Sequence, residues 1–247
     1  KIFDKILSKA DILVENFKPG TLEKWGYGWK DVNKKYPKLI YASASGFGQT
    51  GPLKELPAYD MVVQGMGGLM SVTGQPNSEP TRVGTSIGDI TAGLFTTIGI
   101  NAALYDREKT GKGTFIDVSM LDCQIAILEN AIARYLSKNE IPKPMGSRHP
   151  SIAPFEAFKT KDSHIIIAAG NDKLFEKLCN VLQIPNIFKD EKFNTNSSRS
   201  KNMDELKEIL EAKLSSKITT DWVNQMEKER IPCGPIYNIK AVSYTHL

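Results

Sequence analysis

The sequence reads LIYASASGFGQTGP at residues 39–52 and GTSIGDITAGLFTTIGINAAL at residues 84–104, and these two stretches decide the fold. The first begins as a short β-type run and then becomes rich in glycine and proline, which indicates a loop. The second repeats apolar residues every four positions, which predicts an amphipathic helix. The repeated positions are Ile90, Leu94, Ile98 and Ala102. The two stretches therefore predict a strand, a glycine-rich loop and a long helix.

Asp89 stands among small residues where the loop becomes the helix. One interpretation is structural: an aspartate here would accept hydrogen bonds from free N–H groups and suit the positive end of the helix dipole. The other is functional: the same helix end would keep the carboxylate ionised, beside glycines that let a substrate approach, as a nucleophile requires. The two interpretations are compatible, and local chemistry does not choose between them.

The composition is that of an ordinary globular protein. The 247 residues suggest one or two domains, and 40% hydrophobic with 24% charged residues provide for a sizeable core. The net charge of +4 comes from 32 basic and 28 acidic residues spread along the chain, so it does not indicate a nucleic-acid partner. A local positive patch for an anionic cofactor remains open.

Two further expectations concern location. Cys123, Cys179 and Cys233 are odd in number and widely spaced, so they fit neither a disulfide framework nor a zinc site. A reducing, cytoplasmic environment is therefore expected. No apolar run is expected to approach the length of a membrane span, and no signal peptide is recognised, so we expect no membrane partner.

Further elements are expected on both sides of the central stretches. Ser119 followed by Asp122 resembles a capping box, which predicts a helix over 120–136. A buried stripe is expected on it at Leu121, Ile125, Leu128 and Ile132. The remaining expected elements of this half are strands at 12–14, 38–45 and 114–120, a helix that opens at Thr21, and a helix at 30–36.

The segment KNEIPKPMGSRHPSIAP is rich in proline and polar residues, and it predicts a domain boundary at about 138–150. Beyond it, two strands around a Lys161–Asp162 turn and helices at 171–182, 203–215 and 219–230 predict a small α/β domain. We therefore divide the chain into a large domain at 1–140 and a small domain at 148–241. Arg148 and His149 lie at the boundary, either in a surface linker or as a guanidinium that holds a free carboxylate.

The ends of the chain suggest a fragment. The sequence opens without Met in a helical pattern, and VSYTHL (242–247) reads like one translated frame of a sequencing adapter. Residues 242–247 are therefore expected to be a non-native tail.

Eight motifs in one order resemble the class III CoA-transferase family, also called CaiB/BaiF. They are VENFKPGTLEKWGYGW (14–29), SGFGQTGP (45–52), AYDMVVQGMGGLMSVTG (58–74), GTSIGDITAGL (84–94), KTGKGTFIDVSMLD (109–122), RHPSIAPFEAFKTKD (148–162), AAGND (168–172) and IPCGP (231–235). The resemblance covers nearly the whole chain. It implies a Rossmann-like large domain with a small α/β domain, assembled in the family as an interlocked homodimer.

The resemblance also implies an activity. Asp89 would be the nucleophile that carries CoA from an acyl-CoA donor to a carboxylic acid, with small dicarboxylates such as succinate and glutarate as the nearest substrates. No metal is implied. The candidate CoA contacts are Asn16, Phe17, Lys18, Thr21, Lys24 and Tyr59. From the residues alone, the loop at 16–24 is equally a plain strand-to-helix connection. Relatives often carry arginine at the position of Lys24, so its phosphate contact is expected to be looser.

Tyr59 separates two chemistries. Racemases that resemble this family use a histidine at the equivalent of the AYD segment to move a proton alpha to a thioester. A tyrosine, with an ordinary pKa near 10, is a poor base, so Tyr59 favours acyl transfer. Three alternatives stay open: Tyr59 as a half-buried core residue, an acyl-CoA racemase or epimerase, and a non-catalytic acyl-CoA-binding protein in which Asp89 only caps a helix.

Overall fold

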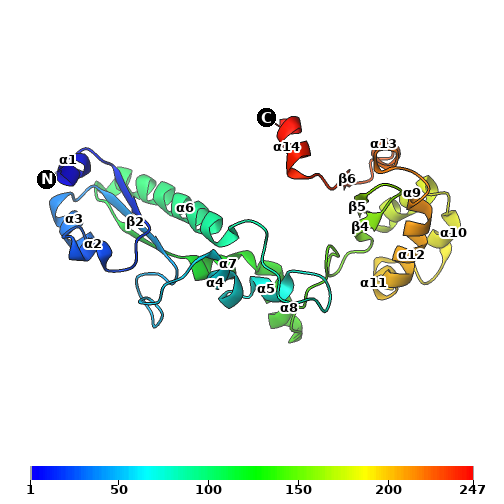
Figure 1. Cartoon of the computed structure of the whole chain (residues 1–247), viewed down its shortest axis with the longest axis horizontal. Coiled ribbons are helices and arrows are strands. Elements are labelled where there is room, and N and C mark those ends of the chain that lie inside the picture. The colour runs from blue at the N-terminus through cyan, green and yellow to red at the C-terminus, as the bar shows by residue number, and fades with distance from the viewer. Residues whose placement is uncertain (1, 247) are drawn as a thin grey trace. The chain divides into compact units, whose positions relative to one another are not determined.

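The computed structural model describes the backbone of residues 2–246 and the side chains of residues 2–243. The chain divides into two compact units, Lys1–Pro144 and Met145–Leu247. Each unit has its own sheet and its own helices (Figure 1). The result is a mixed α/β protein with one parallel and one antiparallel sheet.

The sheet of the first unit has the order β1-β2-β3 and is fully parallel. Its strands are β1 (Ile12–Glu15), β2 (Ile40–Ser45) and β3 (Phe115–Ser119). The central strand β2 is buried along almost its whole length, as expected of a parallel strand covered on both faces. Because the strands are parallel and in register, their carboxyl ends meet at one edge of the sheet, with Ser45 beside Ser119.

Eight helices accompany this sheet within the described residues. They are α1 (Ile2–Leu7), α2 (Thr21–Lys24), α3 (Trp29–Lys35), α4 (Asp60–Met66), α5 (Leu69–Val72), α6 (Ile87–Thr110), α7 (Met120–Ile127) and α8 (Glu129–Lys138). The long helix α6 runs beside the sheet in Figure 1 and packs against β2, β3, α4 and α7.

The apolar stripe expected on α6 does not face the core of this unit. Ile90, Leu94 and Ile98 are 47%, 59% and 62% exposed. The face that packs inward instead carries small residues, Gly88, Thr91, Ala92, Thr96 and Ala103. Small side chains let the helix axis approach the sheet closely, and the larger residues are left on the outer face.

The helix expected at 120–136 starts as predicted but does not continue as one piece. The Asp122 backbone N–H donates to Ser119 Oγ at 3.2 Å, which confirms the cap. The helix then divides at Leu128 into α7 and α8. The predicted buried stripe is wrong, because Ile125 is exposed and α7 buries Met120, Cys123 and Gln124 instead.

Helix α6 also corrects the expectation about apolar runs. Its 24 residues have a mean hydropathy of 1.3 over the best window, so among the described residues one helix has the length and composition of a membrane span. A core helix passes the same test. Helix α6 packs against the sheet, α4 and α7 on one side, and 28% of this window is buried among the described residues.

The second unit has an antiparallel sheet of order β4-β5-β6, formed by β4 (Phe155–Lys159), β5 (His164–Ala168) and β6 (Cys233–Pro235). The predicted hairpin around Lys161–Asp162 is confirmed. The helices are α9 (Asp172–Val181), α10 (Pro185–Lys189), α11 (Asn196–Lys201), α12 (Met203–Leu214), α13 (Thr219–Lys228) and α14 (Ile239–His246). The sequence did not predict α10, α11 or β6. Helix α14 extends into the expected non-native tail, of which Leu247 lies outside the described residues.

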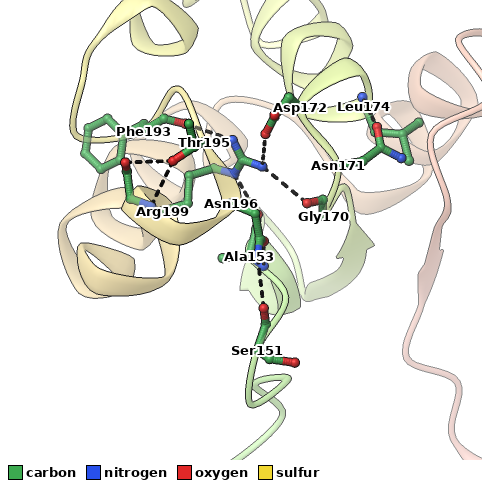
Figure 2. A network of polar contacts seen from close by, with 11 residues as sticks. Ser151, Ala153, Gly170, Asn171, Asp172, Leu174, Phe193, Thr195, Asn196 and Arg199 are labelled. Carbon is green, nitrogen blue, oxygen red and sulfur yellow. Dashed lines mark hydrogen bonds and ion pairs between the residues drawn. The ribbon is translucent and has the colours of Figure 1, made fainter.

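A fully buried arginine ties the loops of the second unit together (Figure 2). Arg199 donates from Nε to the carbonyl of Ala153 at 2.7 Å and from Nη1 to that of Phe193 at 2.9 Å. Its Nη2 donates to the carbonyl of Gly170 at 3.2 Å and to Asp172 Oδ1 at 2.8 Å. A buried guanidinium with this many acceptors compensates its desolvation, so the network holds four chain segments in place.

Candidate active site

A cavity of about 280 Å³ lies in the first unit at the carboxyl edge of its parallel sheet. Five separate segments line it: Asn16–Pro19, Ser45–Gly46, Leu56–Tyr59, Asp89 and Met120. The structure thus brings together five of the predicted site residues, Asn16, Phe17, Lys18, Tyr59 and Asp89. Thr21 and Lys24 do not line this cavity.

The topology explains why these segments meet. The first segment follows β1, and the second begins at the last residue of β2. Ligands of open α/β sheets bind outside the carboxyl ends of the strands. The loop after β2 also needs glycine at position 46. A Cβ at Gly46 would lie 2.3 Å from Cβ of Ala58, so only glycine allows this close approach.

The beginning of α6 is capped by Asp60 and not by Asp89. Asp60 Oδ1 accepts from the Gly88 backbone N–H at 2.7 Å, and Oδ2 accepts from Gln64 Nε2 at 2.8 Å. Gln64 Oε1 in turn accepts from the Val83 backbone N–H at 2.9 Å. Gly88 permits the contact, because a Cβ there would lie 2.9 Å from Asp60 Oδ1. The capping function that could have explained Asp89 therefore belongs to a residue 29 positions earlier in the chain.

Asp89 is exposed at the cavity and, among the described residues, its carboxylate makes no hydrogen bond or ion pair. Partial burial raises the pKa of Asp89, and the nearby charge of Asp60 raises it further. The direction is opposite to the one expected from the helix dipole alone. A carboxylate that is exposed at a cavity and has no described partner is available to a ligand.

The loop at 16–21 is held in shape by its own polar groups. Asn16 Nδ2 donates to the Ala44 carbonyl at 2.6 Å, which attaches the loop to β2. The Thr21 hydroxyl donates to the Lys18 carbonyl at 2.6 Å. Phe17 packs edge-on against Trp25 with ring centroids 5.5 Å apart and remains partly exposed. Asn16 and Thr21 thus shape the loop, while Phe17 and Lys18 offer a ring and an ammonium at the cavity.

Tyr59 lines the cavity just before α4 and is 81% exposed. The alternative that it is a half-buried core residue is therefore wrong. None of the described residues that line this cavity is a histidine. Within residues 2–246, no group of three or more His, Cys, Asp or Glu side chains is placed to hold a metal ion.

Arg148 and His149 have structural partners in the second unit. Arg148 pairs with Glu156 at 3.1 Å and with Asp204 at 2.9 Å. His149 Nδ1 accepts from the Ile152 backbone N–H at 3.0 Å, and its ring stacks on Phe155. The guanidinium is thus already bound to carboxylates of this unit, which favours the structural interpretation of this pair.

Sequence reasoning missed several lining residues, most notably Ser45 and Met120. Both lie inside motifs quoted above, at the last position of β2 and the first of α7. Their positions at the carboxyl edge of a parallel sheet were the available signal. Asp60 was also missed, because nothing local indicates a cap for a helix that begins at residue 87.

The comparison with known proteins agrees with the motif order. The family model for CoA-transferase family III matches residues 1–246. The chain belongs to CoA-transferase family III.

Its relatives in this family are named transferases. The chain is 45% identical to an acetyl-CoA:oxalate CoA-transferase of Acetobacter aceti, over 96% of this chain and 61% of that protein. It is 40% identical to the succinyl-CoA:glutarate CoA-transferase of Mus musculus, over 98% of this chain and 56% of that protein. A CaiB/BaiF family protein from Brucella suis has a similar structure, with a TM-score of 0.88 and 40% identity over 99% of this chain and 65% of that one. The chain spans less than two thirds of each of these relatives.

Proposed function

We propose that the protein containing this chain is a CoA-transferase that moves CoA from an acyl-CoA donor to a small dicarboxylic acid, through an aspartyl-CoA thioester on Asp89. The observation that carries the proposal is that the Asp89 carboxylate has no partner among the described residues and lies at a cavity it shares with the loop at 16–19. Asp60 accepts the hydrogen bond of the Gly88 N–H at the start of α6, so Asp89 is not needed as the cap. The relatives named above act on oxalate and glutarate, which supports a small dicarboxylate as acceptor.

The reaction has four steps. An oxygen of Asp89 attacks the thioester carbon of the donor, the C–S bond breaks, and CoA leaves as a thiolate, which gives a mixed anhydride. The thiolate attacks the carbonyl carbon of Asp89, and the donor acid leaves as a carboxylate. The acceptor carboxylate then attacks the aspartyl-CoA thioester and releases the thiolate again. Attack of the thiolate on the acceptor carbon gives the product acyl-CoA and restores Asp89.

The cavity suits these steps. Phe17 offers a ring to the adenine or pantetheine of CoA, and Lys18 offers a positive charge to its phosphates. Asn16 holds their loop against β2, so the two side chains are placed by a fixed backbone. Thr21 and Lys24 remain predicted CoA contacts that would have to lie outside this cavity.

We further propose a homodimer built on a Rossmann-like large domain, in a reducing compartment such as the cytoplasm. The exposed apolar residues Ile90, Leu94 and Ile98 on α6 support a protein partner for this face, since exposed apolar stripes of this kind mark interfaces. The three cysteines are free, which agrees with a reducing compartment. Sedimentation of the full-length protein measures the first point: a monomer at micromolar concentration would contradict it.

The test of the function uses the protein expressed from the complete gene. It is incubated with succinyl-CoA and then with hydroxylamine, and mass spectrometry locates any hydroxamate. We expect the hydroxamate on Asp89, and none in Asp89→Asn. Asp106→Asn is the matched control, because Asp106 is an exposed aspartate of the same helix outside the cavity. An unmodified Asp89 in a folded protein that binds CoA, with every acyl-CoA tried, would refute the nucleophile assignment.

The same preparations separate the two alternatives. A racemase would incorporate solvent deuterium at the alpha position of its acyl-CoA without any transfer. A non-catalytic binding protein would bind acyl-CoA equally well in Asp89→Asn and would form no covalent adduct.

A further inference from the structure

The Ser45 hydroxyl is a buried polar group with no partner in the part of the chain that the structure describes. Ser45 is 4% exposed, and among the described residues no hydrogen-bond partner reaches its Oγ. An unpaired buried hydroxyl costs roughly 1–3 kcal/mol, so folded proteins rarely retain one unless something else binds it. Ser45 lines the cavity that also contains Asp89, and a ligand there is the available partner.

A second serine on the same strand, Ser43, has hydrogen-bond partners for its hydroxyl. Ser43 is two residues earlier in β2, so both side chains lie on the same face of the sheet. The Ser43 hydroxyl donates to Glu15 Oε1 and accepts from Gln49 Nε2, the latter at 2.8 Å. Ser43 is therefore a structural hydroxyl, whereas Ser45 has its hydrogen bond available.

The lining of the cavity indicates which part of a ligand reaches Ser45. Ser45 and Met120 form its buried wall, whereas Phe17, Tyr59 and Asp89 are exposed. A group that contacts both Ser45 and Asp89 has to fit within this cavity. The volume of about 280 Å³ also suits a thioester with a short acyl chain and not a whole CoA molecule.

We propose that the Ser45 hydroxyl donates a hydrogen bond to the acyl oxygen of the CoA thioester and keeps it as negative charge develops on that oxygen during attack by Asp89. This rests on the proposed function, since it names a further residue of the same site. Burial strengthens the hydrogen bond, because no water competes for the oxygen. In this assignment Ser45 touches the reacting group directly.

A binding experiment tests the contact without any reaction. Two unreactive probes are used: a CoA analogue in which CH₂ replaces the sulfur but the acyl carbonyl is kept, and a CoA alkyl thioether that lacks the carbonyl. In the full-length protein we expect Ser45→Ala to weaken the carbonyl probe about tenfold and to leave the thioether unchanged. Equal weakening of both probes would overturn the proposal, because Ser45 would then contact the CoA portion. No weakening of either would overturn it as well.

Stability and rate complete the test. Ser45→Ala removes an unsatisfied group, so it should leave the unfolding midpoint unchanged or raise it, whereas Ser43→Ala should lower it. With succinyl-CoA and glutarate, we expect Ser45→Ala to lower kcat by roughly 10²–10³ with little change in KM, and Ser45→Thr to keep more of the rate. If the wild-type protein forms the Asp89 hydroxamate and Ser45→Ala has an unchanged kcat, the proposal is overturned. Absence of that hydroxamate, with the binding difference intact, would instead overturn only the transferase mechanism.

Discussion

The cap that Asp60 provides for α6 predicts a measurable loss of stability when it is removed. Asp60 is 9% exposed and accepts two hydrogen bonds, from Gly88 at 2.7 Å and from Gln64 at 2.8 Å. In Asp60→Ala both donors lose their acceptor in a buried setting.

The magnitude follows from these two bonds. A hydrogen bond to a charged group contributes about 1.5–3 kcal/mol, so the two bonds set an upper figure of roughly 6 kcal/mol. The substitution also removes the desolvation penalty of a buried carboxylate, and this offsets part of the loss. We expect a net loss of about 3 kcal/mol for Asp60→Ala. Asp60→Asn keeps the acceptor for Gly88 but loses the one for Gln64, so it should lose about 1 kcal/mol.

Urea unfolding of the full-length protein, followed by circular dichroism, measures both values. Asp106→Ala is the control, because Asp106 is exposed near the C-terminal end of the same helix, where a negative charge is unfavourable. It should change the free energy of unfolding by less than ~0.5 kcal/mol. If Asp60→Ala behaves like this control, Asp60 does not cap α6, and Asp89 could then be needed for that structural role.

Three further predictions follow from other residues. The pKa of Asp89 is raised above the ordinary value of 3.8, first by burial and then by the charge of Asp60. Because the nucleophile has to be ionised, transferase activity should fall as the pH drops through this raised pKa. A kcat/KM profile whose acid limb lies at or below 3.8 would contradict this. Hydrogen bonds from the backbone and hydroxyl of Thr219 lower the pKa of Asp162. Its contribution to stability is therefore present above the ordinary aspartate pKa and is lost as the pH falls through the lowered pKa, so the difference in melting temperature between wild type and Asp162→Asn should shrink over that range. A constant difference would count against the contact. Arg199→Ala should destabilise the second unit by about 3–5 kcal/mol in chemical denaturation. The control Lys192→Ala removes an exposed ion pair with Glu205 and should cost ~0–1 kcal/mol. Equal losses would show that the buried network stabilises the unit no more than an exposed ion pair.

The sequence predicted the local elements of this chain well wherever the signal was short-range. The strands around Tyr41 and Ile116, the cap at Ser119 and the hairpin at Lys161–Asp162 follow from residues within a few positions of each other. It also predicted five of the residues that line the cavity, but through resemblance and not through local chemistry, which left the role of Asp89 open.

The errors concern contacts between distant residues. The pattern of Ile90, Leu94 and Ile98 correctly indicated a helix but not its buried face, because close packing on the sheet selects small residues such as Ala92 and Thr96. A period of four residues specifies a stripe and does not say which neighbour it meets. The Asp60 cap and the burial of the Ser45 hydroxyl could likewise not be predicted from the sequence, because both depend on segments that meet only in the folded structure.

The parallel sheet also has a consequence for the synthesis of the protein. Strand β2 ends at Ser45, and its second partner β3 begins only at Phe115, about 70 residues later. At ribosomal rates of about 5–20 residues per second, the edge of β2 that β3 will cover stays unpaired for roughly 4–14 s. During that interval the apolar strand presents free N–H and C=O groups to other nascent chains. Slowing translation between residues 46 and 114 should therefore increase aggregation, whereas the same delay after residue 120 should not.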